Sequence, residues 1–389
     1  MYYNFDEEID RTQSSCVKYE LLRDVFGRTD ILPMWIADMD FKTPDFIINA
    51  IKERCSHEIL GYTCVPKTYI DVVLSWFERR YRIKTTWENM HFIPGIVQGI
   101  AFVIQAFTQP NDKILLATPI YPPFLNVPKN TGRIVVNSTL LLRNGHLEFD
   151  FQDLEAKAKE CKMMILVNPH NPGGRVWTKE ELQHIAEICF KHHVLVISDE
   201  IHADLTLPGF EHISFSTVSP QAADNSITFF APSKTFNMPG LASSVCYVGN
   251  EHIRKQYFAY LDANELSLGN IFAFVGAEAA FRYGEPWLEQ LLVYLQDNIN
   301  FVEQYLREKL PSVKMIKPEA SFLIWLDFRQ WAMSQTDLMR FLTDKAKVGF
   351  VNGTDYGIDG TGFMRMNIAC PRKIVQEALE SIKKATLSL

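Results

Sequence analysis

Residues 163–202 read MMILVNPHNPGGRVWTKEELQHIAEICFKHHVLVISDEIH. The stretch contains two short apolar runs, at 163–168 and 194–198, and uninterrupted runs of this kind are typical of strands buried on both faces. Between them, Lys179–His193 has a helical pattern, with Thr178 as a candidate N-cap and acidic residues in the first turn. A strand, a helix and a second strand in this order predict a βαβ unit and therefore a mainly parallel sheet.

Further candidate strands extend this pattern along the chain. Apolar runs at 113–118, 227–230 and 244–248 alternate with amphipathic helical segments from about residue 45 onward. The sequence therefore predicts an α/β fold in which a three-layer αβα domain contains a mainly parallel sheet with helices on both faces.

After Pro286 the pattern changes to that of a smaller α+β domain. A long helical segment at 288–310 is followed by candidate strands at 322–327 and 363–368 and by a closing helix at 373–386. The predicted organisation is an N-terminal segment that joins the small domain (1–45), a large domain (46–285) and a small C-terminal domain (286–389).

Length and composition exclude several classes of protein. The 389 residues exceed what a single core usually supports, and 47% hydrophobic with 22% charged residues is typical of a globular protein. A net charge of -7 without a basic run argues against nucleic acid as a partner. No stretch approaches the roughly 18 uninterrupted apolar residues of a membrane span, so we expect no membrane partner.

The cysteines and the first residues indicate the compartment. Seven cysteines are scattered and never spaced as CxxC, which predicts neither a disulfide framework nor a metal site. Residues 1–10 are acidic and aromatic and lack the pattern of a secretory signal peptide, so we expect the mature chain to begin near Met1. Both observations favour a cytoplasmic protein with reduced thiols.

Polar residues follow three of the predicted strands. These segments are Asn168–Arg175, Ser198–His202 and Ala231–Lys234. In open parallel sheets, ligands bind outside the carboxyl ends of the strands. The three segments are therefore the first candidates for a functional site.

Lys234 and Asp199 are the residues whose chemistry points to a cofactor. Lys234 follows a strand and precedes a segment with little helical tendency, and taken alone it is better explained as a surface lysine. Asp199 ends an apolar strand, where a carboxylate needs a function unless it is an N-cap or part of an ion pair. A pyridine ring between them gives both a role, because the amine condenses with an aldehyde and the carboxylate keeps the ring nitrogen protonated. This combination predicts pyridoxal 5'-phosphate (PLP), with Lys234 carrying it as a Schiff base.

Other strand-end residues have a structural and a functional interpretation each. Pro94–Gly99 opens an apolar helix, which favours either a phosphate at the helix N-terminus or close packing. Asn171 either favours the geometry of the turn in which it lies or donates a hydrogen bond to the 3-oxygen of the cofactor. Tyr121 is a core aromatic or stacks on the pyridine ring. His202 is a loop histidine or a second neighbour of that oxygen.

Arg365 is the candidate for substrate binding in the small domain. It lies in the strand-like alternation Gly362–Ile368. A guanidinium that points inward suits bidentate binding of a substrate carboxylate, whereas one that points outward forms a surface salt bridge.

Together, these motifs resemble the fold-type I PLP-dependent enzymes of the aminotransferase class I/II superfamily, over nearly the whole chain. The resemblance is carried by NPHNPGGR at 168–175, SDEIH at 198–202 and Ser233-Lys234, in the order and at the spacing of the superfamily. PMWIADMDF at 33–41, together with DEIH, is similar to the cystathionine β-lyase branch of the MalY/PatB type.

The resemblance implies a role for each residue of the site. The catalytic residues are Lys234, Asp199 and Tyr121, of which Asp199 pairs with the pyridine nitrogen and Tyr121 stacks on the ring. Asn171 and His202 contact the 3-oxygen, and Ala37, Asn171 and Arg365 bind the substrate. Phosphate is bound by Ile96, Val97, Ser233 and, from a neighbouring subunit, Tyr62, which implies a homodimer with shared active sites.

Two positions depart from the pattern of the superfamily. Ala242 stands eight residues after the lysine, where a basic residue commonly contacts the phosphate, and Ala231 stands three residues before it, where serine is frequent. We therefore expect cofactor affinity to be lower or differently supported.

The predicted reaction is α,β-elimination from cystathionine- or cysteine-type amino acids, which yields pyruvate, ammonia and a thiol. An aminotransferase that passes an amino group from an amino acid to a 2-oxo acid uses the same residues and is the alternative. A PLP-binding regulatory protein without turnover is a third possibility, against which the complete set of lysine, aspartate and arginine argues.

Overall fold

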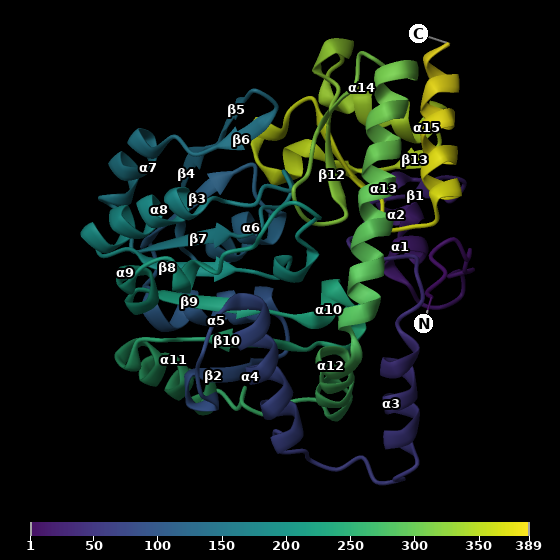
Figure 1. The fold of residues 1–389 in the computed structure, drawn as a ribbon. Helices are drawn as coiled ribbons and strands as arrows, with labels where there is room; N and C mark the ends of the chain where they lie inside the picture. The colour runs from purple at the N-terminus through teal and green to yellow at the C-terminus, as the bar shows by residue number, and fades with distance from the viewer. Residues whose placement is uncertain (1, 388–389) are drawn as a thin grey trace.

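The computed structural model describes residues 2–387, so the predicted start of the mature chain at Met1 lies outside the described residues. A seven-stranded sheet with the order β2-β10-β9-β8-β7-β3-β4 forms the centre of the large domain (Figure 1). Only β10 runs antiparallel to its neighbours, which confirms the mainly parallel sheet. The strands are β2 (Met90–Ile93), β3 (Lys113–Thr118), β4 (Ile134–Thr139), β7 (Met163–Val167), β8 (Leu195–Asp199), β9 (Ser226–Phe230) and β10 (Ser244–Tyr247).

Helices cover both faces of the sheet, as the apolar runs predict. Along β7, Ile165 packs into one core and its neighbour Met164 into the other, because successive side chains of a strand point to opposite faces. The first face is covered by α5 (Ile96–Phe107), α6 (Pro122–Asn130) and α11 (Glu251–Ala263), and the second by α7 (Phe151–Ala158), α8 (Lys179–Lys191) and α9 (Pro220–Asp224). Thr178 caps α8 in a reciprocal capping box with Glu181, so this N-cap prediction is confirmed.

A smaller antiparallel sheet, with the order β11-β12-β15-β14, follows in the C-terminal part. Its strands are β11 (Lys314–Ile316), β12 (Leu323–Asp327), β14 (Val351–Asn352) and β15 (Phe363–Asn367), and the helices beside it are α13 (Glu285–Lys309), α14 (Gln335–Arg340) and α15 (Arg372–Thr386). The smaller α+β domain is therefore present. The exact domain limits at 45 and 285 remain a prediction.

The N-terminal segment connects the two parts of the molecule. It contains α1 (Val17–Glu20), α2 (Leu22–Phe26) and β1 (Leu32–Pro33), and β1 pairs in parallel with β13 (Val348–Gly349) of the C-terminal part. The chain then continues through α3 (Asp45–Cys55) and α4 (Lys67–Tyr81), which both pack against α12 (Ile271–Tyr283). In Figure 1 the connection between α3 and α4 projects away from both sheets. Among the described residues, no helix is long and apolar enough to span a membrane.

The 168–175 turn joins the large domain to the segment before β12. The Gly174 carbonyl accepts hydrogen bonds from the backbone N–H groups of Glu319 (2.8 Å) and Ala320 (3.0 Å). Arg175 adds a salt bridge of 2.7 Å to the Glu319 carboxylate. Gly174 has a φ of +67°, and a Cβ placed there would lie 2.5 Å from the Cβ of Pro318. The position therefore requires glycine for two reasons: the left-handed backbone conformation and the lack of space for a side chain.

We expect Gly174→Ala to lower the free energy of unfolding by about 3 kcal/mol, because left-handed strain and a steric clash add. Gly145 is the matched control, since its φ is +82° but a Cβ added there would have nothing within 4 Å of it. Gly145→Ala should cost only about 1 kcal/mol from backbone strain. Urea denaturation of both variants measures the difference, and equal losses would contradict the proposed close contact at Gly174.

Candidate active site

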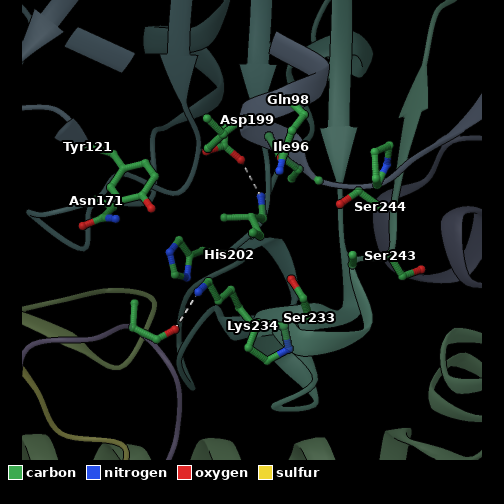
Figure 2. A pocket seen from close by; sticks show the side chains of 17 residues that line it. Ile96, Gln98, Tyr121, Asn171, Asp199, His202, Ser233, Lys234, Ser243 and Ser244 are labelled. Carbon is green, nitrogen blue, oxygen red and sulfur yellow. Dashed lines mark hydrogen bonds between the residues drawn. The ribbon is translucent and has the colours of Figure 1, made fainter. Parts of the chain in front are cut away.

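A cavity lies at the carboxyl ends of the central parallel strands, where the polar segments predicted it (Figure 2). It brings together side chains from the N-terminal segment, α5, the three strand-end segments and the start of α6. The predicted site residues in its wall are Ala37, Ile96, Val97, Tyr121, Asn171, Asp199, His202, Ser233 and Lys234.

Lys234 and Asp199 approach the cavity from opposite sides (Figure 2). Lys234 lies in the short helix α10 (Pro232–Thr235), which Pro232 at the first helical position initiates. Its Nζ donates a hydrogen bond of 2.6 Å to the Ala37 carbonyl. Burial, assisted by the charge of Arg365, lowers the pKa of the Lys234 amine to about 8.

Asp199 is the last residue of β8 and is 4% exposed. Its carboxylate accepts one hydrogen bond, from the backbone N–H of Ile201 at 3.1 Å. Burial raises the pKa of this carboxyl to about 7, although Ile201 and Lys234 favour its charged form. Because the Lys234 amine bonds to the Ala37 carbonyl and not to Asp199, the carboxylate is available to a cation that enters the cavity between them.

The start of α5 supplies hydrogen-bond donors to one end of the cavity. The first intrahelical bond runs from the N–H of Gly99 to the carbonyl of Gly95, so the amides of Ile96 and Val97 have no acceptor within the helix. Together with the helix dipole, these amides favour an anion. Figure 2 shows Ser244 beside the start of α5 and Ser233 next to Lys234.

Tyr121, Asn171 and His202 form another wall of the cavity. Tyr121 is the N-cap residue of α6, and its ring contacts Phe124 edge-on with 5.5 Å between centroids. His202 is 2% exposed and its Nδ1 has no hydrogen-bond partner among the described residues. Burial lowers the pKa of His202 to about 3, so the imidazole is neutral and can exchange a hydrogen bond with a polar ligand atom.

Arg365 extends from β15 towards the cavity wall formed by Asn171. The guanidinium is 4% exposed, and it donates to the Trp35 carbonyl (2.8 Å) and to Oδ1 of Asn171 (3.4 Å). Its Nε has no partner among the described residues. The inward orientation excludes a surface salt bridge and leaves donor capacity for a carboxylate.

Two predicted site residues are not part of the cavity wall: Arg365 lies behind Asn171, whereas Tyr62 lies away from the cavity of its own chain. Tyr62 is in the connection between α3 and α4 and is 100% exposed. Ile59 and Leu60 of the same connection are also exposed, at 69% and 62%. A contribution of Tyr62 to a cavity therefore requires a second chain.

The predicted segments contained Gly95, Gln98 and Ile201 of the cavity wall without assigning them a role, and sequence reasoning missed Ser244. Ser244 could not be predicted as a site residue, because the sequence of the strand 244–248 does not indicate whether it runs parallel or antiparallel to its neighbours. Since β10 is antiparallel to β9, its first residue, and not its last, lies at the carboxyl edge of the parallel strands. The hydroxyl of Ser244 has no hydrogen-bond partner among the described residues, and it lines the same cavity end as Ile96.

Comparisons with known proteins agree with this geometry. The sequence model of the family described as aminotransferase class I and II matches residues 29–382. The chain belongs to this family. Among curated members, cystathionine beta-lyase PatB of Bacillus subtilis is 42% identical over 384 residues, which cover 98% of this chain and 99% of the relative.

Solved structures of family members superpose over almost the entire chain. A PLP-bound putative aminotransferase from Clostridium difficile has a TM-score of 0.97 at 41% identity and covers 99% of this chain and 100% of its own. A PLP-bound C-S lyase from Staphylococcus hominis has a TM-score of 0.92 at 34% identity and covers 99% of this chain and 98% of its own. The family and fold predicted from the motifs are thus confirmed.

We expect Ser244→Ala to weaken the binding of PLP to the apoprotein by about tenfold or more, because one hydrogen bond to the negatively charged phosphate would be lost. Pyridoxal, which has no phosphate, is the control ligand and should bind both proteins alike. Titration of apoprotein fluorescence with each compound measures the affinities. An equal loss for both compounds would show that Ser244 does not contact the phosphate.

Proposed function

We propose that this protein is a PLP-dependent carbon–sulfur β-lyase that cleaves cystathionine- or cysteine-type amino acids to pyruvate, ammonia and a thiol. The observation that carries the proposal is the pair formed by Lys234 and Asp199, which reach one cavity from opposite sides. Full-length similarity to cystathionine beta-lyase PatB and to a C-S lyase supports the reaction type.

The side chains of the cavity fit PLP at each of its polar groups. Asp199 has an available carboxylate for the ring nitrogen, and the orphaned Nδ1 of His202 suits the ring oxygen. The amides at the start of α5 suit the phosphate. The amine of Lys234 suits the aldehyde, and Tyr121 would flank the ring.

Substrate binding would depend on Arg365. Its guanidinium would bind the substrate carboxylate, with the backbone of Ala37 and the amide of Asn171 as further contacts. Arg365 is already held by the Trp35 carbonyl. This fixed orientation means that little side-chain freedom is lost when the carboxylate binds.

Lys234 would act as the base once its amine is released from the cofactor. When bound, PLP supplies a protonated ring that accepts the electron pair left on the α-carbon. The Lys234 amine must be neutral to remove the α-proton, and a pKa of about 8 makes a useful fraction neutral near physiological pH. Asp199 would hold the proton on the ring nitrogen while the thiolate leaves the β-carbon.

Incubation of the holoenzyme with cystathionine should release pyruvate and thiol in equal amounts without any added 2-oxo acid. Lys234→Ala should reduce the rate by about a thousandfold or more, because both the attachment point and the base are lost. A coupled lactate dehydrogenase assay measures pyruvate. Wild-type protein that retains PLP absorbance but releases no pyruvate from any sulfur amino acid would contradict lyase activity.

An aminotransferase is the second candidate, because a solved structure with a TM-score of 0.97 is described as a putative aminotransferase. The cavity alone does not separate the two reactions, since both begin with removal of the same α-proton. Amino-group transfer would require a 2-oxo acid acceptor and give ping-pong kinetics. The same assay with and without an acceptor therefore distinguishes the candidates.

The proposal includes a homodimer in which Tyr62 reaches the partner's phosphate site. The exposed connection that contains Ile59, Leu60 and Tyr62 supports it, because large apolar side chains of this kind mark protein interfaces. A groove between residues 60–63 and 268–272 lies on the same surface.

A cytoplasmic location also remains a prediction.

Shared sites predict complementation between two inactive variants. A heterodimer of Lys234→Ala and Tyr62→Ala subunits would contain one site with both residues intact, so an equal mixture should recover about a quarter of wild-type activity after subunit exchange. The matched control mixes Lys234→Ala with Asp199→Asn, whose heterodimers have a defect in each site. Heterodimers that form without any gain over this control would rule out a contribution of Tyr62 in trans.

A further inference from the structure

The loop formed by Trp35–Phe41 is held almost entirely by side chains that are distant in the sequence. Asn367 donates to the carbonyls of Ile36 and Asp38, both at 2.6 Å, and Asn237 donates to those of Met39 and Phe41. Arg365 donates to the Trp35 carbonyl, and Lys234 to the Ala37 carbonyl. The loop has no regular secondary structure, so these side chains replace the backbone partners of a helix or strand.

The two carboxylates of the loop belong to a buried charge network. Lys18, in α1, is 1% exposed, and its ammonium lies 3.0 Å from Asp40 and 3.2 Å from Asp38. Arg11 bridges the same two carboxylates at 2.6 Å each. Two cations thus neutralise two anions. A lysine is almost never buried to this extent unless it is paired.

This network lies next to the reactive amine. Asp38 follows Ala37 directly in the sequence, and the Ala37 carbonyl accepts the hydrogen bond from Lys234. Charges of the network act on the pKa of Lys234, which Asp38 raises and Lys18 lowers. The other groups facing that amine are Arg365, Asp199 and the neutral imidazole of His202, and those facing the network are Cys16, Tyr19 and Cys370.

We propose that Lys18, together with Arg11, is a positioning residue that fixes the Trp35–Phe41 loop so that the Ala37 carbonyl holds the released amine of Lys234. The inference rests on the proposed function, since it concerns the stages of the reaction in which this amine is free. The carbonyl accepts a hydrogen bond and leaves the nitrogen lone pair directed into the cavity. Neutrality of the network keeps an additional charge away from the base.

The test uses variants that change the charge of the network in opposite directions. Lys18→Met leaves one net negative charge and Asp40→Asn one net positive charge. Lys18→Met/Asp40→Asn restores neutrality. Lys42→Met is the matched control, because Lys42 follows the loop but is 60% exposed and pairs only with Glu7 among the described residues.

The readout is the rate at which PLP associates with each apoprotein as a function of pH, followed by absorbance. Condensation with the aldehyde releases water and requires the neutral amine, so the midpoint of the rate reports the Lys234 amine. We expect a wild-type midpoint near pH 8, in line with the lowered pKa of about 8. Lys18→Met should raise the midpoint by about one unit, Asp40→Asn should lower it by about one unit, and the double variant should return it towards wild type.

Steady-state kinetics of the loaded enzymes complete the test. Lys18→Met should reduce kcat by about tenfold with little change in KM, because the base and not the substrate is misplaced. Lys42→Met should leave both values and the midpoint unchanged. If Lys18→Met does not fold, the downward shift in Asp40→Asn decides the question.

Midpoints of Lys18→Met and Asp40→Asn that equal the wild-type value in folded proteins would overturn the inference. Association of PLP does not depend on the reaction of the loaded enzyme. A wild-type protein that yields no pyruvate would therefore disprove the lyase without affecting the comparison of midpoints.

Discussion

The site depends on a buried carboxyl, Asp199, and a half-buried amine, Lys234, which are not paired to each other. Asp199 has one backbone donor and Lys234 one backbone acceptor. Desolvation of both is unfavourable, and it moves the two pKa values towards each other, to about 7 and about 8. In the proposed function, Asp199 would pair with the ring nitrogen of the cofactor and the amine of Lys234 would hold its aldehyde carbon, so each group would gain the partner that it lacks. The chain is thus organised around a ligand rather than around an internal ion pair.

Much of this arrangement could be predicted from local sequence. The five strands proposed at 113–118, 163–168, 194–198, 227–230 and 244–248 agree with β3, β7, β8, β9 and β10 to within one residue at either end. Uninterrupted apolar runs of this kind leave little ambiguity, since both faces of a central strand are buried. The edge strand β4 is half polar, and the four residues of β2 include a histidine, so neither had a pattern strong enough to be recognised.

What could not be predicted concerns direction and long-range contact. The antiparallel orientation of β10 moves Ser244 into the cavity, and no local signal distinguishes the two ends of a short strand. Lys18 and Arg11 also could not be connected to the site, because their partners lie 20 to 29 residues away in a segment without regular structure. The inward direction of Arg365 was left open by its alternating strand and is decided by the carbonyl of Trp35.

The phosphate end of the cavity has a consequence for the supply of the cofactor. With alanine at 231 and 242, the described wall of the cavity contains no cationic side chain other than Lys234. A dianion would be bound there mainly by amides, hydroxyls and a helix dipole, which are fixed in place and carry no mobile counter-ions. Retention of the cofactor should therefore respond only weakly to ionic strength, and the fraction of loaded protein would follow the concentration of free PLP in the surroundings.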